Sequence, residues 1–427
     1  MVMKRTVSLL LCVLLLFLAC GCSKEKKKGA EKVLEGRLTE MPCYALGENA
    51  TAGEMRQAAL KAHRDALSVQ WYTDKDFSYT KIGPFEGERF SYNTREIYCG
   101  LPYTMGDTSL IHWLQYYDFS TGKMTGDFTK DISNRLGNAC CESIKWAWGA
   151  VCGDQMWDFP INVTPLNGVI PVGEYTVDSS IARYDLISTD DICRKNGEEV
   201  MYRSYAAALP ADLVVSYPLN HCMMVNEQPN IVYDKNGNID PDKSYLTIED
   251  QRGGILNKTL PYRVIGKGGK IYHYSGNLST KWSFSALYDN GYLPYTCAQF
   301  LGKKPYEKAY VRSSAENPAT YGEIEYSYVE SNFNIVCASA VISDKDGKEI
   351  VNDKAMNFVD FYRKSLIKSK DKQLYLKFAL NDTNNPLLNK TTIKSKLKSG
   401  QDYNIKISVT VATGETFEVI NKTVKYE

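Results

Sequence analysis

The chain has 427 residues, of which 44% are hydrophobic and 24% charged, and 51 Lys and Arg against 50 Asp and Glu give a formal net charge of +1. At roughly 150 residues per domain this length predicts two or three domains, which excludes a small disulfide-stapled module and a fully disordered chain. The balanced charge argues against a nucleic-acid partner, because nonspecific binding to phosphate backbones needs a clustered positive surface.

The first 22 residues have the pattern of an export signal. A basic start precedes an apolar run over residues 7–19, which is too short for a membrane span of about 20 residues. Small residues directly before Cys20 and Cys22 resemble the bacterial lipoprotein lipobox, whose cysteine is lipidated. This resemblance implies an extracytoplasmic protein that is anchored to the bacterial membrane by a lipid on one of the two cysteines, with residues 23–43 as a charged tether. The alternative is an ordinary secretory signal with a cysteine nearby by chance.

The cysteine pattern predicts no metal site. Of the 12 cysteines, three lie within the first 22 residues and nine follow them. No CxxC spacing suggests zinc or a thioredoxin-type redox motif, and an odd number cannot pair completely, so at least one thiol is left free. We expect no cofactor, since no nucleotide motif is present either.

The first half of the chain alternates helices with short strands. Residues 51–69 carry apolar residues at helical spacing with charges between them, which predicts an amphipathic helix. Residues 71–103 are aromatic and interrupted by glycine and proline, which favours strands and turns. A short helix is expected at 110–117, and a buried helix at 142–151, entered by a tight turn.

A hairpin is predicted after a loop-rich stretch that follows Pro160. Strands are expected at 211–215 and 221–225, and a returning strand at 245–250 lies beyond an Asn-Gly turn. Residues 282–288 are predicted to form a helix.

The pattern changes from about residue 304 onward. Alternating runs such as 324–328 and 403–409, separated by turns, predict regularly spaced strands with little helix. Residues 304–427 are therefore predicted to form an all-β sandwich of immunoglobulin-like type.

Cys140 and Cys141 stand at the start of the helix predicted at 142–151, where N–H groups and the helix dipole lower a thiol pKa from about 8.5. A cysteine hydrolase also needs a base within hydrogen-bond reach and a polar group that fixes the tautomer of the base. Of the four histidines, His221 opens a predicted strand and is the natural base.

Three segments, in this order, resemble the NlpC family of papain-like cysteine peptidases, best known as cell-wall endopeptidases and amidases. Residues 100–106 read GLPYTMG and are similar to the family's G-x-P-Y-x-x-G, which implies that Tyr103 lies beside the nucleophile and binds substrate. Residues 140–148 read CCESIKWAW and resemble the nucleophile helix. Residues 210–214 read PADLV, similar to P-G-D-L-V, and His221 follows nine residues after their Asp.

The register of the second segment selects Cys140 as nucleophile. Aligning Cys140 places Ile144 and the aromatic-Ala-aromatic run on the family's apolar and aromatic positions, whereas Cys141 would place Lys145 at an apolar position. Cys141 is then a small neighbour, and Cys152 and Cys222 are most simply core thiols. Two departures from the family pattern, Ala139 for an Asp and Ala211 for a Gly, put the substrate in doubt more than the chemistry.

The third catalytic residue is expected on the strand at 245–250 or just after it. In the resembling family this residue is a polar side chain on the strand after the histidine strand. Strand alternation puts Glu249 and Gln251 on one face and the neighbouring Leu and Ile on the other. Glu249 is the first choice and Gln251 the second, although a solvated face would explain both equally well.

The resemblance covers residues 90–255 and implies an α+β fold. The expected organisation is a papain-like, NlpC-type domain over residues 44–303, with an antiparallel sheet and a nucleophile helix, followed by the sandwich. The implied function is a cysteine hydrolase that cleaves amide bonds, with peptidoglycan peptides as the substrate. One alternative is a hydrolase or acyltransferase acting on another extracellular amide or ester, and a second is a catalytically silent surface-binding lipoprotein.

Overall fold

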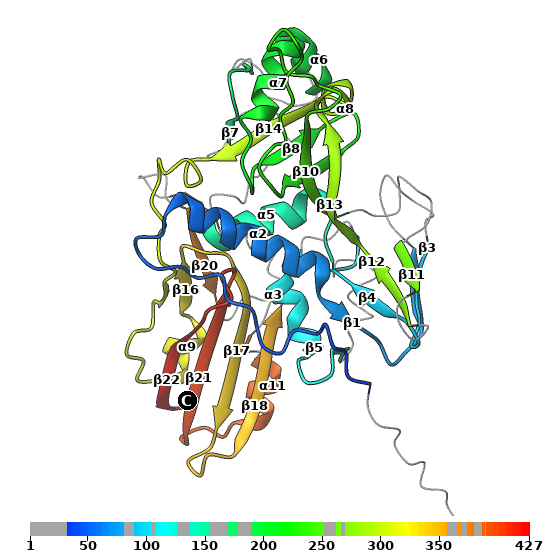
Figure 1. Cartoon of the computed structure of the whole chain (residues 1–427). Helices are drawn as coiled ribbons and strands as arrows, with labels where there is room; N and C mark the ends of the chain where they lie inside the picture. Colours follow the sequence, from blue (N-terminus) through cyan, green and yellow to red (C-terminus); the bar gives the residue numbers. More distant parts are fainter. Residues whose placement is uncertain are drawn as a thin grey trace, which may run out of the picture.

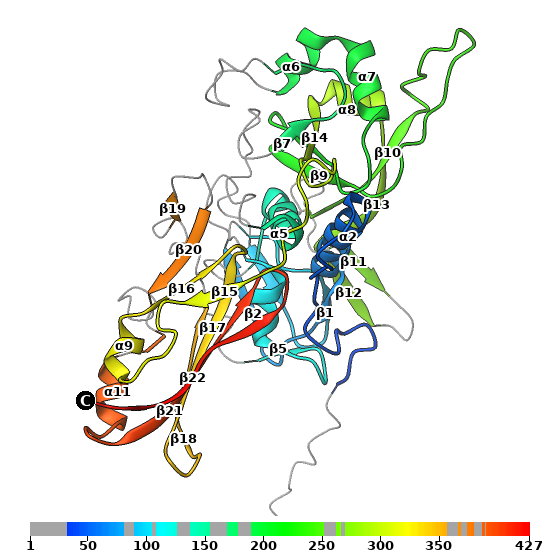
Figure 2. The same cartoon turned by 90° about the vertical axis from the view of Figure 1, so that its left-hand side faces the viewer.

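The computed structural model describes residues 32–80, 89–104, 108–125, 137–153, 169–177, 189–251, 262–265, 270–356, 366–368, 374–379, 387–388 and 390–427. The fold is mixed α+β, with several antiparallel sheets and few helices. In both views, α2 (Ala52–Ser68) and α5 (Cys140–Cys152) lie between a six-stranded sheet and the strands of the C-terminal part (Figures 1 and 2).

The six-stranded sheet is antiparallel throughout and has the order β13-β10-β9-β8-β14-β7. Its strands, in that order, are Gly276–Ser283, Tyr245–Gln251, His221–Val225, Leu213–Ser216, Tyr292–Cys297 and Val169–Pro171. The predicted hairpin is confirmed, since β9 and β10 pair antiparallel, and the Asn-Gly turn lies between them. Three short helices cluster beside this sheet (Figure 1): α6 (Thr189–Asn196), α7 (Glu198–Ala206) and α8 (Phe284–Asp289).

A second sheet has four strands in the order β1-β4-β12-β11. It lies beside the lower end of β13 in Figure 1. Its strands are Gln70–Trp71, Ile97–Cys99, Ile271–Tyr274 and Tyr262–Ile265. Two two-stranded sheets lie near it in sequence, β2–β3 (Phe77–Thr80 and Arg89–Tyr92) and β5–β6 (Tyr117–Asp118 and Lys123–Met124). The helix expected at 110–117 is a single turn, α3 (Leu110–Trp113), followed by the 3-10 turn Leu114–Tyr116.

Local sequence explains why α2 begins where it does. Thr51 accepts a hydrogen bond from the Glu54 amide, and the Glu54 carboxylate accepts one from the Thr51 amide, which forms a capping box. The buried side chains then recur at helical spacing and face α5. The sequence predictions of α2 and α5 are confirmed, and α5 begins two residues earlier than expected, at Cys140.

The C-terminal part contains two antiparallel four-stranded sheets. One has the order β15-β16-β20-β19, formed by Val311–Ser313, Tyr328–Ser331, Leu374–Ala379 and Leu366–Lys368. The other has the order β18-β17-β21-β22, formed by Glu349–Met356, Ile335–Ser343, Asp402–Val411 and Thr416–Lys425. The strand expected at 403–409 is confirmed as part of β21. Two short helices accompany these sheets, α9 (Tyr321–Glu325) and α11 (Lys390–Lys396).

Two predictions of secondary structure were wrong. Residues 324–328 alternate like a strand, but α9 occupies the first half of the run because Thr320 caps the helix by accepting from the Glu323 amide. The stretch after Pro160 was predicted as loop, yet it contains α6 and α7. Their apolar side chains are few, and Gly197, with φ +82°, separates the two helices, so neither has a long apolar period.

A single hydrophobic cluster runs through α2, α5, the six-stranded sheet and the C-terminal strands. It continues across residue 304, the predicted domain boundary. Hydrogen bonds cross the same boundary: the Tyr44 amide donates to the Thr413 carbonyl (2.7 Å) and the Leu46 amide to the Tyr306 hydroxyl (3.0 Å). Within the described ranges, we find no helix of the length and apolar character needed to cross a bilayer.

Candidate active site

Cys140 is the first residue of α5 and is buried, with 4% of its surface exposed. Ala139 occupies the N-cap position in an extended conformation and has no polar side chain to cap the helix. The first N–H groups of α5 therefore point along the helix start, where they stabilise negative charge on a sulfur or on a developing oxyanion. The prediction of a cysteine at a helix N-terminus is confirmed.

His221 is the first residue of β9, where the sequence placed it, and its exposed fraction is 8%. Its Nε2 lies 2.8 Å from Oδ2 of Asp250. Its imidazole is near enough to the Cys140 sulfur to lower the pKa of that thiol. Because Nε2 is engaged by Asp250, Nδ1 is the ring nitrogen left to serve the thiol. The three side chains thus form a cysteine–histidine–aspartate series.

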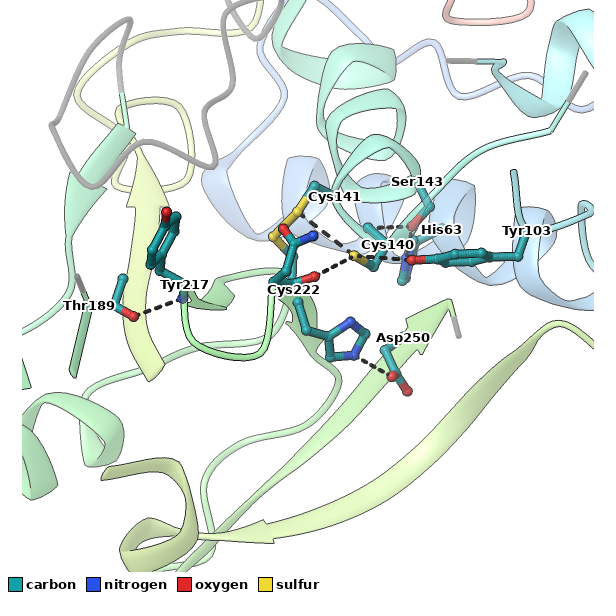
Figure 3. Close-up of a disulfide and its surroundings, with 11 residues drawn as sticks. His63, Tyr103, Cys140, Cys141, Ser143, Thr189, Tyr217, Cys222 and Asp250 are labelled. Atoms are coloured by element: carbon teal, nitrogen blue, oxygen red, sulfur yellow. Dashed lines mark hydrogen bonds and ion pairs between the residues drawn. A yellow bond between two sulfur atoms is a disulfide. The ribbon is translucent and has the colours of Figure 1, made fainter. Parts of the chain in front are cut away.

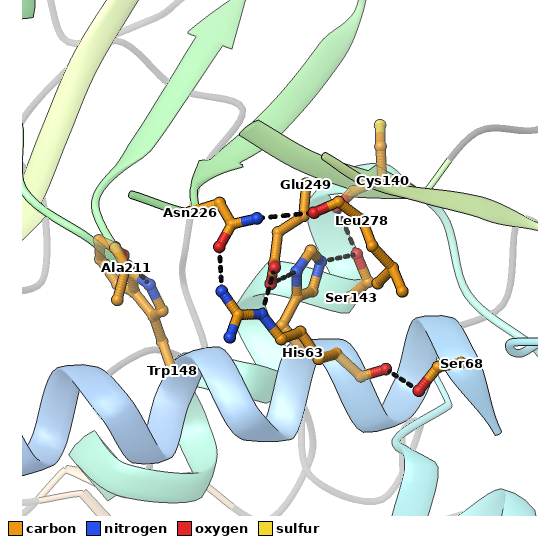
Figure 4. Close-up of polar contacts among 10 residues, drawn as sticks. His63, Ser68, Cys140, Ser143, Trp148, Ala211, Asn226, Glu249 and Leu278 are labelled. Atoms are coloured by element: carbon orange, nitrogen blue, oxygen red, sulfur yellow. Dashed lines mark hydrogen bonds and ion pairs between the residues drawn. The ribbon is translucent and has the colours of Figure 1, made fainter. Parts of the chain in front are cut away.

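The carboxylate that binds His221 belongs to Asp250, so the choice of Glu249 or Gln251 as orienting residue was wrong. Glu249 points toward α2 and accepts from His63 Nδ1 and Arg64 Nε, both at 2.8 Å (Figure 4). Gln251 donates through Nε2 to the carbonyl oxygen of Leu101 at 2.9 Å. Both side chains are buried, so the alternative of a solvated face is wrong as well.

Side chains that contact Glu249 also reach the first turn of α5. His63 Nε2 lies 3.1 Å from the hydroxyl of Ser143, and this hydroxyl donates to the carbonyl oxygen of Cys140 at 2.8 Å (Figure 4). Arg64 also binds Asn226, which follows β9. One polar network, buried except for the partly exposed Arg64, therefore connects α2, β10, the end of β9 and the first turn of α5.

Charge is stabilised on both reacting groups. Burial by itself would raise the pKa of Cys140, but the hydrogen bond and charge of His221, the Cys222 amide and the Tyr103 hydroxyl together bring that pKa below its ordinary value. Burial likewise disfavours protonated His221, yet the hydrogen bonds with Asp250 and Cys140 and the charges of both raise the pKa of His221 to about 9. Both shifts favour the charged forms of the pair, a thiolate beside an imidazolium, over the neutral forms.

Tyr103 lies beside Cys140, as expected. Its hydroxyl donates to the Cys140 sulfur at 3.8 Å (Figure 3). A short backbone ladder holds it there, because the Asn138 amide donates to Pro102 and the Thr104 amide donates to Asn138, both at 3.1 Å. Burial, together with the neighbouring Cys140, raises the pKa of Tyr103 well above its usual range, so the hydroxyl stays protonated as a donor.

Cys141 and Cys222 form a disulfide, which the sequence did not reveal. Cys141 was expected to be a small neighbour of Cys140, and Cys222 a core thiol. Figure 3 shows the bond next to Cys140, whose sulfur is 3.9 Å from that of Cys141. The only signal in the sequence is that each of these cysteines directly follows a residue of the predicted dyad, Cys140 or His221.

The third motif, residues 210–214, holds neighbouring elements together. Asp212 forms a buried ion pair with Arg56 of α2 (2.7 Å) and accepts from the Leu209 amide (2.7 Å). Ala211 has φ +73°, the left-handed conformation that glycine adopts most easily, and its carbonyl accepts from Trp148 Nε1 at 2.9 Å. The motif thereby connects α2, α5 and the start of β8.

Several predictions fall outside the described residues. Cys20 and Cys22, the export signal and the first part of the tether are among them, as are the last two residues of the first motif. Within the part of the chain that the structure describes, no group of three or more His, Cys, Asp or Glu side chains is arranged to hold a metal ion.

No family model matches this chain, and no curated protein is significantly similar to it.

Proposed function

We propose that this protein is an extracytoplasmic cysteine hydrolase that cleaves amide bonds. Cys140 is its nucleophile, His221 its general base and acid, and Asp250 the residue that orients the imidazole. The observation that carries the proposal is the convergence of three elements: the N-terminus of α5 supplies the thiol, β9 the imidazole and β10 the carboxylate. This is the set of groups that nucleophilic catalysis by cysteine requires.

In the first half of the reaction, the Cys140 thiolate attacks the carbonyl carbon of the amide. The oxyanion that forms accepts from the backbone N–H of Cys140 at the helix start and from the Tyr103 hydroxyl. The His221 imidazolium then donates its proton to the leaving nitrogen, the C–N bond breaks and the amine departs, which leaves a thioester on Cys140.

In the second half, a water molecule attacks the thioester. His221, now neutral, takes a proton from the water as the C–O bond forms, and collapse of the tetrahedral intermediate expels the Cys140 thiolate. The carboxylic acid product leaves, and the thiolate–imidazolium pair is restored. Asp250 remains ionised and keeps Nε2 of His221 in the donor role throughout.

The chemistry of the site agrees with the NlpC-type resemblance, from which the finer parts of the proposal come. We assign a papain-like fold to the part that contains α2, α5 and the six-stranded sheet, and an immunoglobulin-like sandwich to the two C-terminal sheets. The proposed substrate is a peptide of peptidoglycan, and the proposed location is the outer side of the membrane, through a lipid on Cys20 or Cys22.

The test is hydrolysis of purified sacculi by the purified chain. We expect Cys140→Ala to abolish release of new amino groups, because the attacking sulfur is absent, while the thermal unfolding curve stays close to that of the wild type. Cys337→Ala, which removes a buried thiol from β17, is the matched control and should keep full activity. Undiminished turnover by Cys140→Ala would remove the assignment.

A further inference from the structure

We propose that the Cys141–Cys222 disulfide is a positioning element of the active site, and that it makes the reactivity of Cys140 depend on an oxidising environment. The inference rests on the proposed function, because it concerns the same thiol and imidazole.

The disulfide joins the two elements that carry the reacting groups. Cys141 directly follows Cys140 on α5, and Cys222 directly follows His221 on β9. Their Cα atoms are 5.2 Å apart although the residues are separated by 81 positions in sequence. Because neighbouring Cα atoms are about 3.8 Å apart, a covalent connection fixes nucleophile and base from one residue away on each side.

The sulfur of Cys140 meets β9 at a point where a small shift would change its partners. The Cys222 amide lies close enough to this sulfur to lower the pKa of Cys140, and it thereby favours the thiolate. The Asn220 carbonyl, two residues earlier, lies 3.8 Å from the sulfur and accepts from the protonated thiol instead. Sliding of β9 along α5 would exchange the donor for the acceptor, so the charge on Cys140 depends on the relative position that the disulfide fixes.

A second sulfur pair on the same helix provides a comparison. Cys152, at the other end of α5, lies 3.7 Å from the sulfur of Cys297 on β14, and both are free thiols. Both thiols are buried in the core. Close approach of two sulfurs therefore occurs at both ends of α5, and the disulfide stands at the catalytic end.

The chemistry of the switch is a two-electron reduction. A dithiol reagent transfers two electrons and two protons to the disulfide, which leaves Cys141 and Cys222 as thiols and the reagent as a cyclic disulfide. Disulfides persist outside the cytoplasm, whereas cysteines inside it are kept reduced. In a newly made chain, Cys140 would accordingly not yet be held in place relative to His221. The reactive pair would form when the disulfide forms after export.

The test measures Cys140 and needs no substrate. The rate at which iodoacetamide alkylates Cys140 is followed from pH 5 to pH 9 by residue-level mass spectrometry of the full chain. The test variant is Cys141→Ala with Cys222→Ala, which removes the disulfide without leaving new thiols. The matched control is Cys152→Ala, which removes a buried thiol from the same helix.

In the oxidised wild-type protein, we expect alkylation to stay fast below pH 7, because the thiolate persists there. In the double variant, the midpoint should rise toward the ordinary thiol value of about 8.5, and the rate at pH 6 should fall about tenfold or more. Cys152→Ala should keep the wild-type profile. If the double variant does not fold, the wild-type protein reduced with dithiothreitol and freed of reagent takes its place.

An unchanged profile in the folded double variant, or in the reduced wild type, would overturn the inference while leaving the proposed hydrolase intact. An ordinary thiol profile in the oxidised wild type would instead remove the proposed function, and the inference with it.

Discussion

Asp250 could not be predicted from the sequence as the residue that binds His221. Alternation along β10 correctly separates Glu249 and Gln251 from Ile248 and Asp250, because successive side chains point to opposite faces. It cannot say which face meets the active site, since all of these side chains are buried and a polar residue no longer marks the solvent side. The packing of α2 on one face decides the matter, and that packing is tertiary.

The role of Asp250 predicts a change in pH dependence. Its hydrogen bond and charge help to raise the pKa of His221 to about 9, so removal of the charge should lower this pKa toward its ordinary value of about 6.5. In the proposed mechanism His221 must carry a proton for the leaving nitrogen. The alkaline limb of the kcat/KM profile should therefore move to lower pH in Asp250→Asn. We also expect kcat to fall about 10- to 100-fold. The measurement is a pH–rate series.

Glu249→Gln is the matched control for this variant, because it makes the same change of carboxylate to amide on the opposite face of the same strand. It weakens the contacts with His63 and Arg64, so it should reduce the free energy of unfolding by about 1–3 kcal/mol. Its alkaline limb should stay in place. A shifted limb in Glu249→Gln and an unshifted one in Asp250→Asn would reverse the assignment.

At the scale of elements, the start of β8 requires a backbone conformation that alanine adopts poorly. Ala211 has φ +73°, at the position where the resembling family has glycine, and a left-handed L-residue costs roughly 1–2 kcal/mol. Removal of the methyl group should relieve this strain, although it also removes packing and adds freedom to the unfolded chain. The net effect is best measured against a second buried alanine.

Ala208 provides that comparison, because it is buried three residues earlier and lies outside the left-handed region. We expect Ala211→Gly to be about 1–2 kcal/mol less destabilising than Ala208→Gly in urea unfolding. Equal losses in the two variants would show that Ala211 is not strained.

The elements that could be predicted are those with a long local signal. α2 has a capping box and a regular apolar period, and β9 and β10 flank an Asn-Gly turn. α6 and α7 lack such a signal because they are short and polar and meet at Gly197. α9 was mistaken for a strand because five alternating residues fit both periods, and the Thr320 cap, which decides between them, lies outside that window.

At the scale of the whole molecule, the hydrophobic core does not follow the change in sequence pattern at residue 304. Alternation marks a change of pattern there, but the packing across it could not be predicted, because Tyr44 and Leu46 bind residues more than 250 positions away. The Cys141–Cys222 pairing belongs to the same class, since nine cysteines allow many connectivities and only the fold selects one.

This continuity predicts that the first part of the chain does not fold normally alone. A chain that ends at residue 303 would expose the α3 surface that contacts β17 and would lose the Tyr306 and Thr413 contacts. We expect it to lack the cooperative thermal transition of the full chain and to be digested faster by trypsin, as measured by circular dichroism and gel electrophoresis. A cooperative melt together with wild-type alkylation of Cys140 would show two independent domains.

Three consecutive residues of β10 hold three different parts of the protein: Glu249 binds α2, Asp250 the imidazole, and Gln251 the loop before Tyr103. A slip of one position would bring an amide or a longer acid to His221 and would aim an aspartate at His63. We therefore expect insertions and deletions along this strand to disrupt the site more than substitutions do. The number of residues in β10 should then vary less among distant relatives of this protein than the identity of those residues.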